Sequence, residues 1–185
     1  MLAELSLNIL DIANNSIRAN ATLITIQLLI STKKDRITIR ISDNGDGMSE
    51  EMLTHVEDPF YTTRTTRKIG LGIPFFKAQA LACDGSFSIS SKLGTGTSIE
   101  ATLPLSHIDR MPLGDITSTI HTLITCNPSI DFDYKYTYDD NSFELDTRTF
   151  RAILAPIPFT TKEVSNYIRE YLAENKAETD GNALI

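Results

Sequence analysis

The chain has 185 residues, 41% of them apolar, which is enough to bury a hydrophobic core without a partner. Its formal net charge of −7 and isoelectric point near 4.9 argue against general binding to nucleic acid or to an anionic membrane, because both need a cationic surface. The two cysteines, Cys83 and Cys126, match no metal-binding spacing, and no segment resembles a signal peptide or a membrane-spanning helix, which indicates a cytoplasmic protein.

The first predicted element is an amphipathic helix over residues 1–20, in which apolar side chains recur every three or four positions. A polar stripe with the same spacing consists of Glu4, Asn8, Asp11, Asn15 and Arg18. Such a stripe is either a solvated helix face or part of a site. In a site, Asp11 would accept a proton, and Asn15, one turn later, would offer a neutral oxygen to a hard cation.

Residues 21–31 are predicted to form a strand that is mostly buried on both faces, and residues 36–42 a strand with one buried face. Their short connection favours an antiparallel hairpin. Asp43 stands at the exit of the second strand, and Gly45 and Gly47 after it allow the backbone to turn sharply and to approach a ligand. Alone, this D-x-G-x-G string also fits an ordinary turn or a calcium-binding loop, so its context decides.

A short capped helix over residues 49–56 leads into residues 57–69, which are rich in hydroxyl groups and cations and show no helical or strand period. This segment is either a solvent-facing connection or a lid whose cations and backbone donors surround phosphates. The lid is favoured because Gly70-Leu71-Gly72 follows it and opens a predicted helix over residues 70–83, with Pro74 in the first turn.

Two further strands are predicted over residues 86–90 and 97–103, and the turn-rich run from Pro104 to Gly114 marks a domain boundary. The predicted units are a domain of residues 1–105, an extension of residues 106–176 and a flexible tail of residues 177–185. Within the extension the pattern predicts a helix, a hairpin and a helix over residues 113–126, 130–145 and 161–174. No catalytic group of residues is evident in the extension.

Four signals stand in a fixed order: a carboxylate and an asparagine one helical turn apart, D-x-G-x-G after a strand, a basic segment ending in G-x-G, and Gly-Thr before a late strand. Together they resemble the motifs of the GHKL superfamily, which includes DNA gyrase, Hsp90, MutL and histidine kinases. The matching segments are residues 10–19 (the N box), 43–47 (the G1 box), 58–64 (the F box of histidine kinases), 70–72 (the G2 box) and 96–97. The resemblance covers about residues 4–105.

The resemblance implies that Asn15 ligates the magnesium ion that bridges the ATP phosphates, that Asp43 accepts a hydrogen bond from the adenine amino group, and that Thr97 supports the adenine edge. The glycines of the G1 and G2 boxes would let backbone lie close to the base and the lid fold over the phosphates. A cation among Arg64, Arg67 and Lys68 would offset the phosphate charge. The residues assigned to the nucleotide are therefore Asn15, Asp43, Gly45, Gly47, Thr62, Thr63, Arg64, Lys68, Gly70, Leu71, Gly72 and Thr97.

Two features depart from the pattern of the superfamily. Hydrolytic members and the related anti-sigma serine kinases usually place Glu at the position of Asp11, so Asp11 is predicted to be the catalytic base with a reach one methylene shorter. The chain also begins almost at the N box, where many relatives carry a preceding strand. The C-terminal extension, or a partner chain, is therefore expected to cover a sheet edge.

A third departure concerns the phosphoacceptor. Histidine kinases join this domain to a dimerising helical pair that bears the acceptor histidine, and no such segment precedes the N box here. His55, His107 and His121 lie in no motif and are expected to be structural. We expect an α+β fold: a Bergerat-type two-layer α/β sandwich with a mixed, mostly antiparallel sheet and helices on one face, followed by a small α-β-β-α unit.

The expected function is ATP- and magnesium-dependent transfer of the γ-phosphate to a partner protein, as in a cytoplasmic, histidine-kinase-like regulator. One alternative is a switch in which ATP closes the lid over residues 57–68 and exposes a docking surface without transfer. The other is a slow magnesium-dependent ATPase. Neither nucleic acid nor a membrane is an expected partner.

Overall fold

The computed structural model describes residues 4–56, 72–155 and 157–185, and their strands form one six-stranded sheet in the order β3-β4-β2-β1-β5-β6. The strands are β1 (Leu23–Ser31), β2 (Arg36–Asp43), β3 (Ser86–Lys92), β4 (Gly96–Leu103), β5 (Asp131–Tyr138) and β6 (Asn141–Asp146). The helices in these ranges are α1 (Leu5–Arg18), α2 (Glu50–His55), α3 (Gly72–Ala82), α4 (Ile116–Cys126), α5 (Thr147–Leu154) and α6 (Lys162–Asp180).

The sheet is mixed and mostly antiparallel, which confirms the predicted α+β fold class. Strands β1 and β2 form the predicted hairpin, with Ile26 opposite Ile41, and β4 continues the antiparallel pairing on β2. Strand β5 pairs with the other edge of β1 in parallel, so the extension covers a sheet edge as expected. Both predicted parts of the chain therefore contribute strands to one sheet. The division into two domains at residue 105 stays a prediction.

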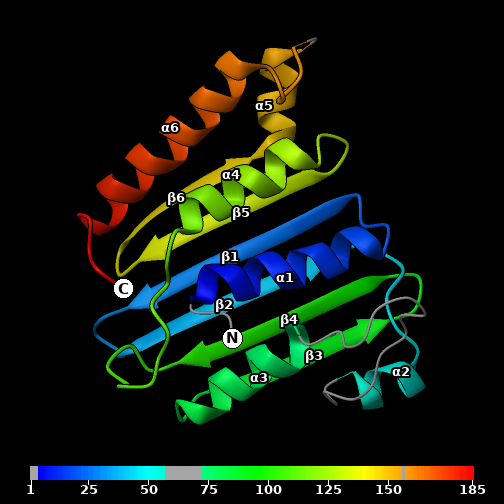
Figure 1. Cartoon of the computed structure of the whole chain (residues 1–185), viewed down its shortest axis with the longest axis vertical. Coiled ribbons are helices and arrows are strands. Elements are labelled where there is room, and N and C mark those ends of the chain that lie inside the picture. Colours follow the sequence, from blue (N-terminus) through cyan, green and yellow to red (C-terminus); the bar gives the residue numbers. More distant parts are fainter. Residues whose placement is uncertain (1–3, 57–71, 156) are drawn as a thin grey trace.

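The helices lie over one face of the sheet, as Figure 1 shows for α1, α3 and α4. Burial alternates along β1 accordingly: its even-numbered residues from Ile24 to Ile30 are buried, whereas the odd-numbered ones are only half-buried. The prediction that residues 21–31 are mostly buried on both faces therefore holds fully for the face under the helices and partly for the other. None of the described helices is long and apolar enough to cross a membrane.

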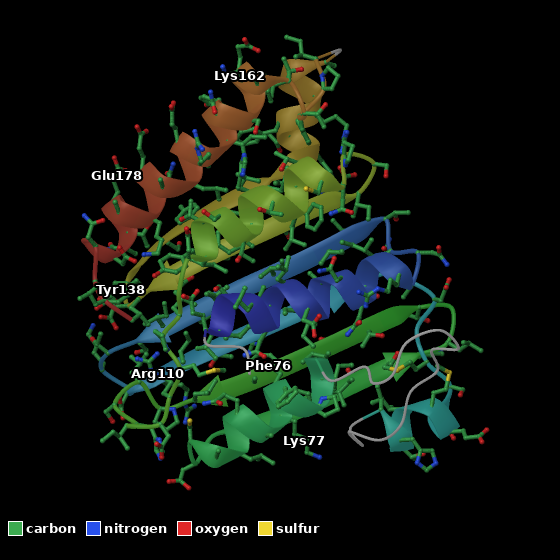
Figure 2. The ribbon with its side chains drawn as sticks, in the orientation of Figure 1. Phe76, Lys77, Arg110, Tyr138, Lys162 and Glu178 are labelled. Atoms are coloured by element: carbon green, nitrogen blue, oxygen red, sulfur yellow. The ribbon has the colours of Figure 1, made fainter. Side chains whose placement is uncertain are left out.

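Helix α3 shows how the two layers pack. Phe76 is fully buried, and its ring meets that of Phe87 on β3 edge to face, with 6.2 Å between the ring centroids. Figure 2 labels Phe76 on the side of α3 toward the middle of the molecule and Lys77 on the outer side. This packing fixes the start of α3 relative to the sheet, and that start borders the candidate site.

The extension differs from its prediction at three places. Helix α4 begins at Ile116 rather than at residue 113, because Gly114 adopts a φ of +75° and Asp115 caps the helix by accepting a hydrogen bond from the Ser118 backbone N–H. Helix α5 was not predicted; Asp146 caps it through the Arg148 backbone N–H. Helix α6 runs to Asp180, so residues 177–180 of the predicted tail are helical.

Two of the histidines make contacts within the extension and its connection to the first domain. His121 Nε2 of α4 lies 2.9 Å from Ser165 Oγ and so links α4 to α6. His107 Nδ1 accepts the Asp109 backbone N–H at 3.2 Å, within the connection that follows β4. Both contacts accord with structural roles.

The end of α6 is joined to β5 by a buried polar cluster. The Asp180 carboxylate is fully buried and accepts hydrogen bonds from the Tyr136 hydroxyl at 2.8 Å and from Lys176 Nζ at 2.7 Å. Burial, followed by the hydrogen bond to Asp180, raises the pKa of Tyr136 far above its ordinary value. The hydroxyl therefore serves as a permanent donor to Asp180.

Replacing Tyr136 with phenylalanine is expected to lower the free energy of unfolding by about 1–3 kcal/mol, because the buried Asp180 loses one donor. Urea denaturation followed by circular dichroism measures the change. The matched control is Tyr138→Phe on the same strand, because the Tyr138 hydroxyl makes no hydrogen bond to the residues that the structure describes. Equal losses in the two variants would contradict the proposed role of the hydroxyl.

Candidate functional site

Helix α1 carries Asp11 and Asn15, and the extension holds its first turn. The backbone N–H groups of Leu5 and Ser6 donate to the carbonyl oxygens of Pro112 and Leu113, each at 2.9 Å. These N–H groups have no partner inside a helix, so the segment after β4 satisfies them. The extension therefore helps to hold α1 in its position on the sheet.

The polar stripe of α1 is not a simple solvated face. Glu4 Oε2 accepts the Asp115 backbone N–H at 3.3 Å, and Asn8 is only 1% exposed. Asp11 and Asn15 further along the stripe are half-buried. The stripe therefore faces other parts of the chain at its start, and the two candidate site residues lie where it becomes accessible.

Asp43 is the last residue of β2 and is held by three donors. Its Oδ2 accepts from Ser16 Oγ at 2.5 Å, and its Oδ1 accepts the backbone N–H groups of Gly45 at 2.9 Å and Thr97 at 3.3 Å. The donors come from α1, from the turn after β2 and from the start of β4. The carboxylate is therefore fixed at the point where the N box, the G1 box and the Gly-Thr motif meet.

The glycines around Asp43 make room for the chain itself. A Cβ on Gly45 would lie 2.4 Å from the Ala19 carbonyl oxygen. Gly47, with a φ of +65°, packs against the Lys92 carbonyl, and Gly96, with a φ of +124°, packs against that of Asp43. Contacts within the protein thus require these glycines, whatever each does toward a ligand.

Asp11 meets the beginning of α3. A Cβ on Gly72 would lie 2.5 Å from Asp11 Oδ2, so the missing side chain makes room for this carboxylate. The start of a helix carries a partial positive charge, which favours an anion there. The structure therefore brings the N box and the last glycine of the G2 box together.

Asn15 offers an oxygen that already faces a cationic group. Its Oδ1 accepts a hydrogen bond at 2.8 Å from Nη1 of Arg18, which is exposed. A magnesium ion would replace the exposed guanidinium at this oxygen, and an amide oxygen is a suitable ligand for a hard cation. The residues present therefore fit the predicted role of Asn15.

Several predicted site residues lie outside the described part of the chain, and so does the whole predicted lid of residues 57–69. These are Thr62, Thr63, Arg64, Arg67, Lys68, Gly70 and Leu71. Their assignment to the nucleotide stays a prediction.

Sequence reasoning missed two serines that organise the site. Ser16 lies among the buried residues of α1, outside the polar stripe, and its hydroxyl donates to Asp43. Ser91 Oγ accepts the Met48 backbone N–H at 2.8 Å and lies 2.9 Å from Thr97 Oγ1. Strands β3 and β4 pair so that Ser91 lies directly opposite Thr97, and this register could have identified the second serine.

The arrangement can perform three chemical tasks. Asp43 and Thr97 present an acceptor and a hydroxyl at one end, which suits the polar edge of a planar base. Asn15 presents an oxygen ligand in the middle. Asp11, one helical turn from Asn15, presents a carboxylate beside the start of α3. A nucleotide with its base at Asp43 would direct its phosphates toward Asn15 and Asp11.

Comparisons with known proteins identify the family to which the chain belongs. The model of the family described as histidine kinase-, DNA gyrase B-, and HSP90-like ATPases matches residues 1–107. Sporulation kinase D of Bacillus subtilis is 33% identical over 98 residues, which are 53% of this chain and 19% of that protein. Sensor protein kinase FleS of Pseudomonas aeruginosa is 34% identical over 108 residues, 58% of this chain and 26% of that protein.

The matched kinases are much longer than this chain, which spans about a fifth to a quarter of their length. Among solved structures, the Aquifex aeolicus MutL ATPase domain complexed with ADP gives a TM-score of 0.52 over 97% of this chain and 71% of that chain, at 13% identity. The two proteins therefore share their fold. With the family model covering more than half of the residues, the chain belongs to the family of histidine kinase-, DNA gyrase B-, and HSP90-like ATPases.

Proposed function

We propose that this protein binds ATP with magnesium and transfers the γ-phosphate to a partner protein in a regulatory pathway. The observation that carries the proposal is that Asp43, Asn15 and Asp11 lie along one side of α1, because each is suited to a different task toward a nucleotide. The family supports ATP as the ligand, and the matched sensor and sporulation kinases support a kinase-type regulator.

In this proposal the base is recognised first. Asp43 accepts a hydrogen bond from the adenine amino group, and Thr97 contacts the adjacent edge of the ring. Both groups are held by hydrogen bonds within the protein, so little ordering is needed when ATP binds. The base then fixes where the phosphates lie along α1.

The phosphate end depends on α1. Asn15 would hold magnesium, which neutralises phosphate charge when it is bound. The phosphates would supply further oxygen ligands to this ion. The predicted cations of residues 57–68 would contribute further charge.

Asp11 is proposed to orient the acceptor group of the partner protein and to remove its proton during transfer. Its carboxylate is held near the start of α3, one helical turn from Asn15, so an acceptor placed there would approach the γ-phosphate from the side of α1. The same carboxylate could activate water instead, and the experiment must separate transfer from hydrolysis.

The test compares the wild-type chain with Asp11→Asn in the presence of excess magnesium and ATP labelled on the γ-phosphate. Phosphate release and label on protein are measured, first with the purified chain and then with added cell extract. Transfer is expected to fall about 100-fold or more in the variant, because a positioned base contributes about 10²–10⁴-fold, while ATP binding by calorimetry stays within a few-fold.

The control is Asp84→Asn, which makes the same chemical change at a side chain that is 91% exposed in the turn after α3. Label transfer that is unchanged in Asp11→Asn would exclude Asp11 as the base. ATP binding without label or phosphate release would support the switch. Phosphate release by the purified wild-type chain that is lost in Asp11→Asn would support the slow ATPase.

A further inference from the structure

Ser16 uses its hydroxyl to reach a carboxylate that lies on another element of the fold, 27 positions along the chain. Thr125 and Thr179 each donate to the carbonyl oxygen four residues earlier in their own helix, at 2.8 and 2.7 Å. Ser16 instead donates across to Asp43 at 2.5 Å, although it lies inside α1 and is only 4% exposed. Its hydroxyl is therefore used to hold the carboxylate at the end of β2.

The contact determines what Asp43 can offer to a ligand. A carboxylate has about four positions for accepted hydrogen bonds. Two on Oδ1 are taken by the backbone N–H groups of Gly45 and Thr97, and one on Oδ2 is taken by Ser16. One acceptor position is then left, on Oδ2. Of the three donors, only Ser16 is a side chain and can be removed by substitution.

Thr97, the other group at the base edge, is less selective. Ser91 Oγ lies 2.9 Å from Thr97 Oγ1 and 3.0 Å from the Gly96 carbonyl oxygen, so its single proton can be directed to either oxygen. The Thr97 hydroxyl can accordingly donate to a ring nitrogen or accept from a ring N–H. Discrimination between bases must therefore come mainly from Asp43.

We propose that Ser16 is a positioning residue for base selection: by fixing Asp43 Oδ2 it makes the site prefer a purine with an amino group over one with a carbonyl at the same position. An amino group can donate a hydrogen bond to the free acceptor position on Asp43 Oδ2. A carbonyl oxygen there would face the carboxylate oxygen, and two acceptors repel each other. The inference rests on the proposed binding of ATP and adds the residue that sets its selectivity.

The test is calorimetric titration of wild type, Ser16→Ala and Ser6→Ala with ATP and with inosine triphosphate, which carries a carbonyl in place of the amino group. Wild type is expected to bind ATP about 100-fold more tightly. In Ser16→Ala this ratio is expected to fall about tenfold, through weaker ATP binding. Ser6 is also buried on α1, but its hydroxyl donates to Glu4 at 3.1 Å, so its variant is expected to keep the wild-type ratio.

If the role of Ser16 were purely structural, Ser16→Ala would weaken the binding of both nucleotides equally. An unchanged ratio of the two affinities in Ser16→Ala therefore overturns the inference. Purine riboside triphosphate, which has hydrogen at the same position, gives a check on wild type alone. It is expected to bind more weakly than ATP and more tightly than inosine triphosphate. If inosine triphosphate binds as tightly as ATP or as purine riboside triphosphate, the inference is overturned. Failure of wild type to bind any of the three would overturn the proposed function and the inference together.

Discussion

Replacing Asp43 with asparagine is expected to weaken ATP binding about 100-fold, equivalent to about 2.7 kcal/mol. The amide keeps the shape of the carboxylate but carries only one acceptor oxygen. That oxygen will face the backbone N–H groups of Gly45 and Thr97, because these donors cannot turn away. The amide nitrogen then faces Ser16 and the ligand, where it presents donors to the donating amino group of adenine.

Titration calorimetry with ATP measures the change, and thermal unfolding shows whether the variant is folded. The matched control is Asp46→Asn, three residues further along, because Asp46 is exposed and its carboxylate accepts a hydrogen bond from Asn20 Nδ2 at 2.7 Å. We expect the control to bind ATP within about threefold of wild type, as for surface substitutions generally. A folded Asp43→Asn variant that binds ATP as wild type does would place the base somewhere else.

The main parts of this site could be predicted because they depend on short-range patterns. Alternating isoleucines placed Asp43 at a strand exit, and helical spacing placed Asp11 and Asn15 on one stripe. The structure adds the long-range contacts: Ser16 reaches Asp43 across 27 positions, and Thr97 reaches it across 54. A hydroxyl on a largely apolar helix face carries no local signal that its partner is a distant carboxylate.

The extension shows the same limit on a larger scale. Its two strands were predicted from their alternation, but nothing in that pattern says that β5 pairs in parallel with β1. Helix α5 was missed because its eight residues include two β-branched threonines and begin directly at the end of β6. The hydrogen bonds from the first turn of α1 to Pro112 and Leu113 likewise join residues more than 100 positions apart. Such contacts depend on how the layers pack, which the local sequence does not encode.

The second large effect is expected for Gly96→Ala, which should lower the free energy of unfolding by roughly 3–5 kcal/mol. A Cβ at this position would lie 1.9 Å from the Asp43 carbonyl oxygen, so the start of β4 or the end of β2 must shift. The φ of +124° adds strain, because residues with a side chain rarely adopt it. Thermal unfolding should show a midpoint lower by roughly 10 °C.

Gly94→Ala is the matched control, two residues earlier in the same turn. Gly94 also has a positive φ, of +73°, but a Cβ there would meet nothing within 4 Å. It should cost only about 1–2 kcal/mol, from backbone strain alone. The difference between the variants therefore measures the collision with Asp43.

Because this collision displaces the residue proposed to bind adenine, Gly96→Ala should lose ATP binding even where it remains folded, whereas Gly94→Ala should retain it. Equal stabilities in the two variants would mean that β4 does not hold Asp43 in place.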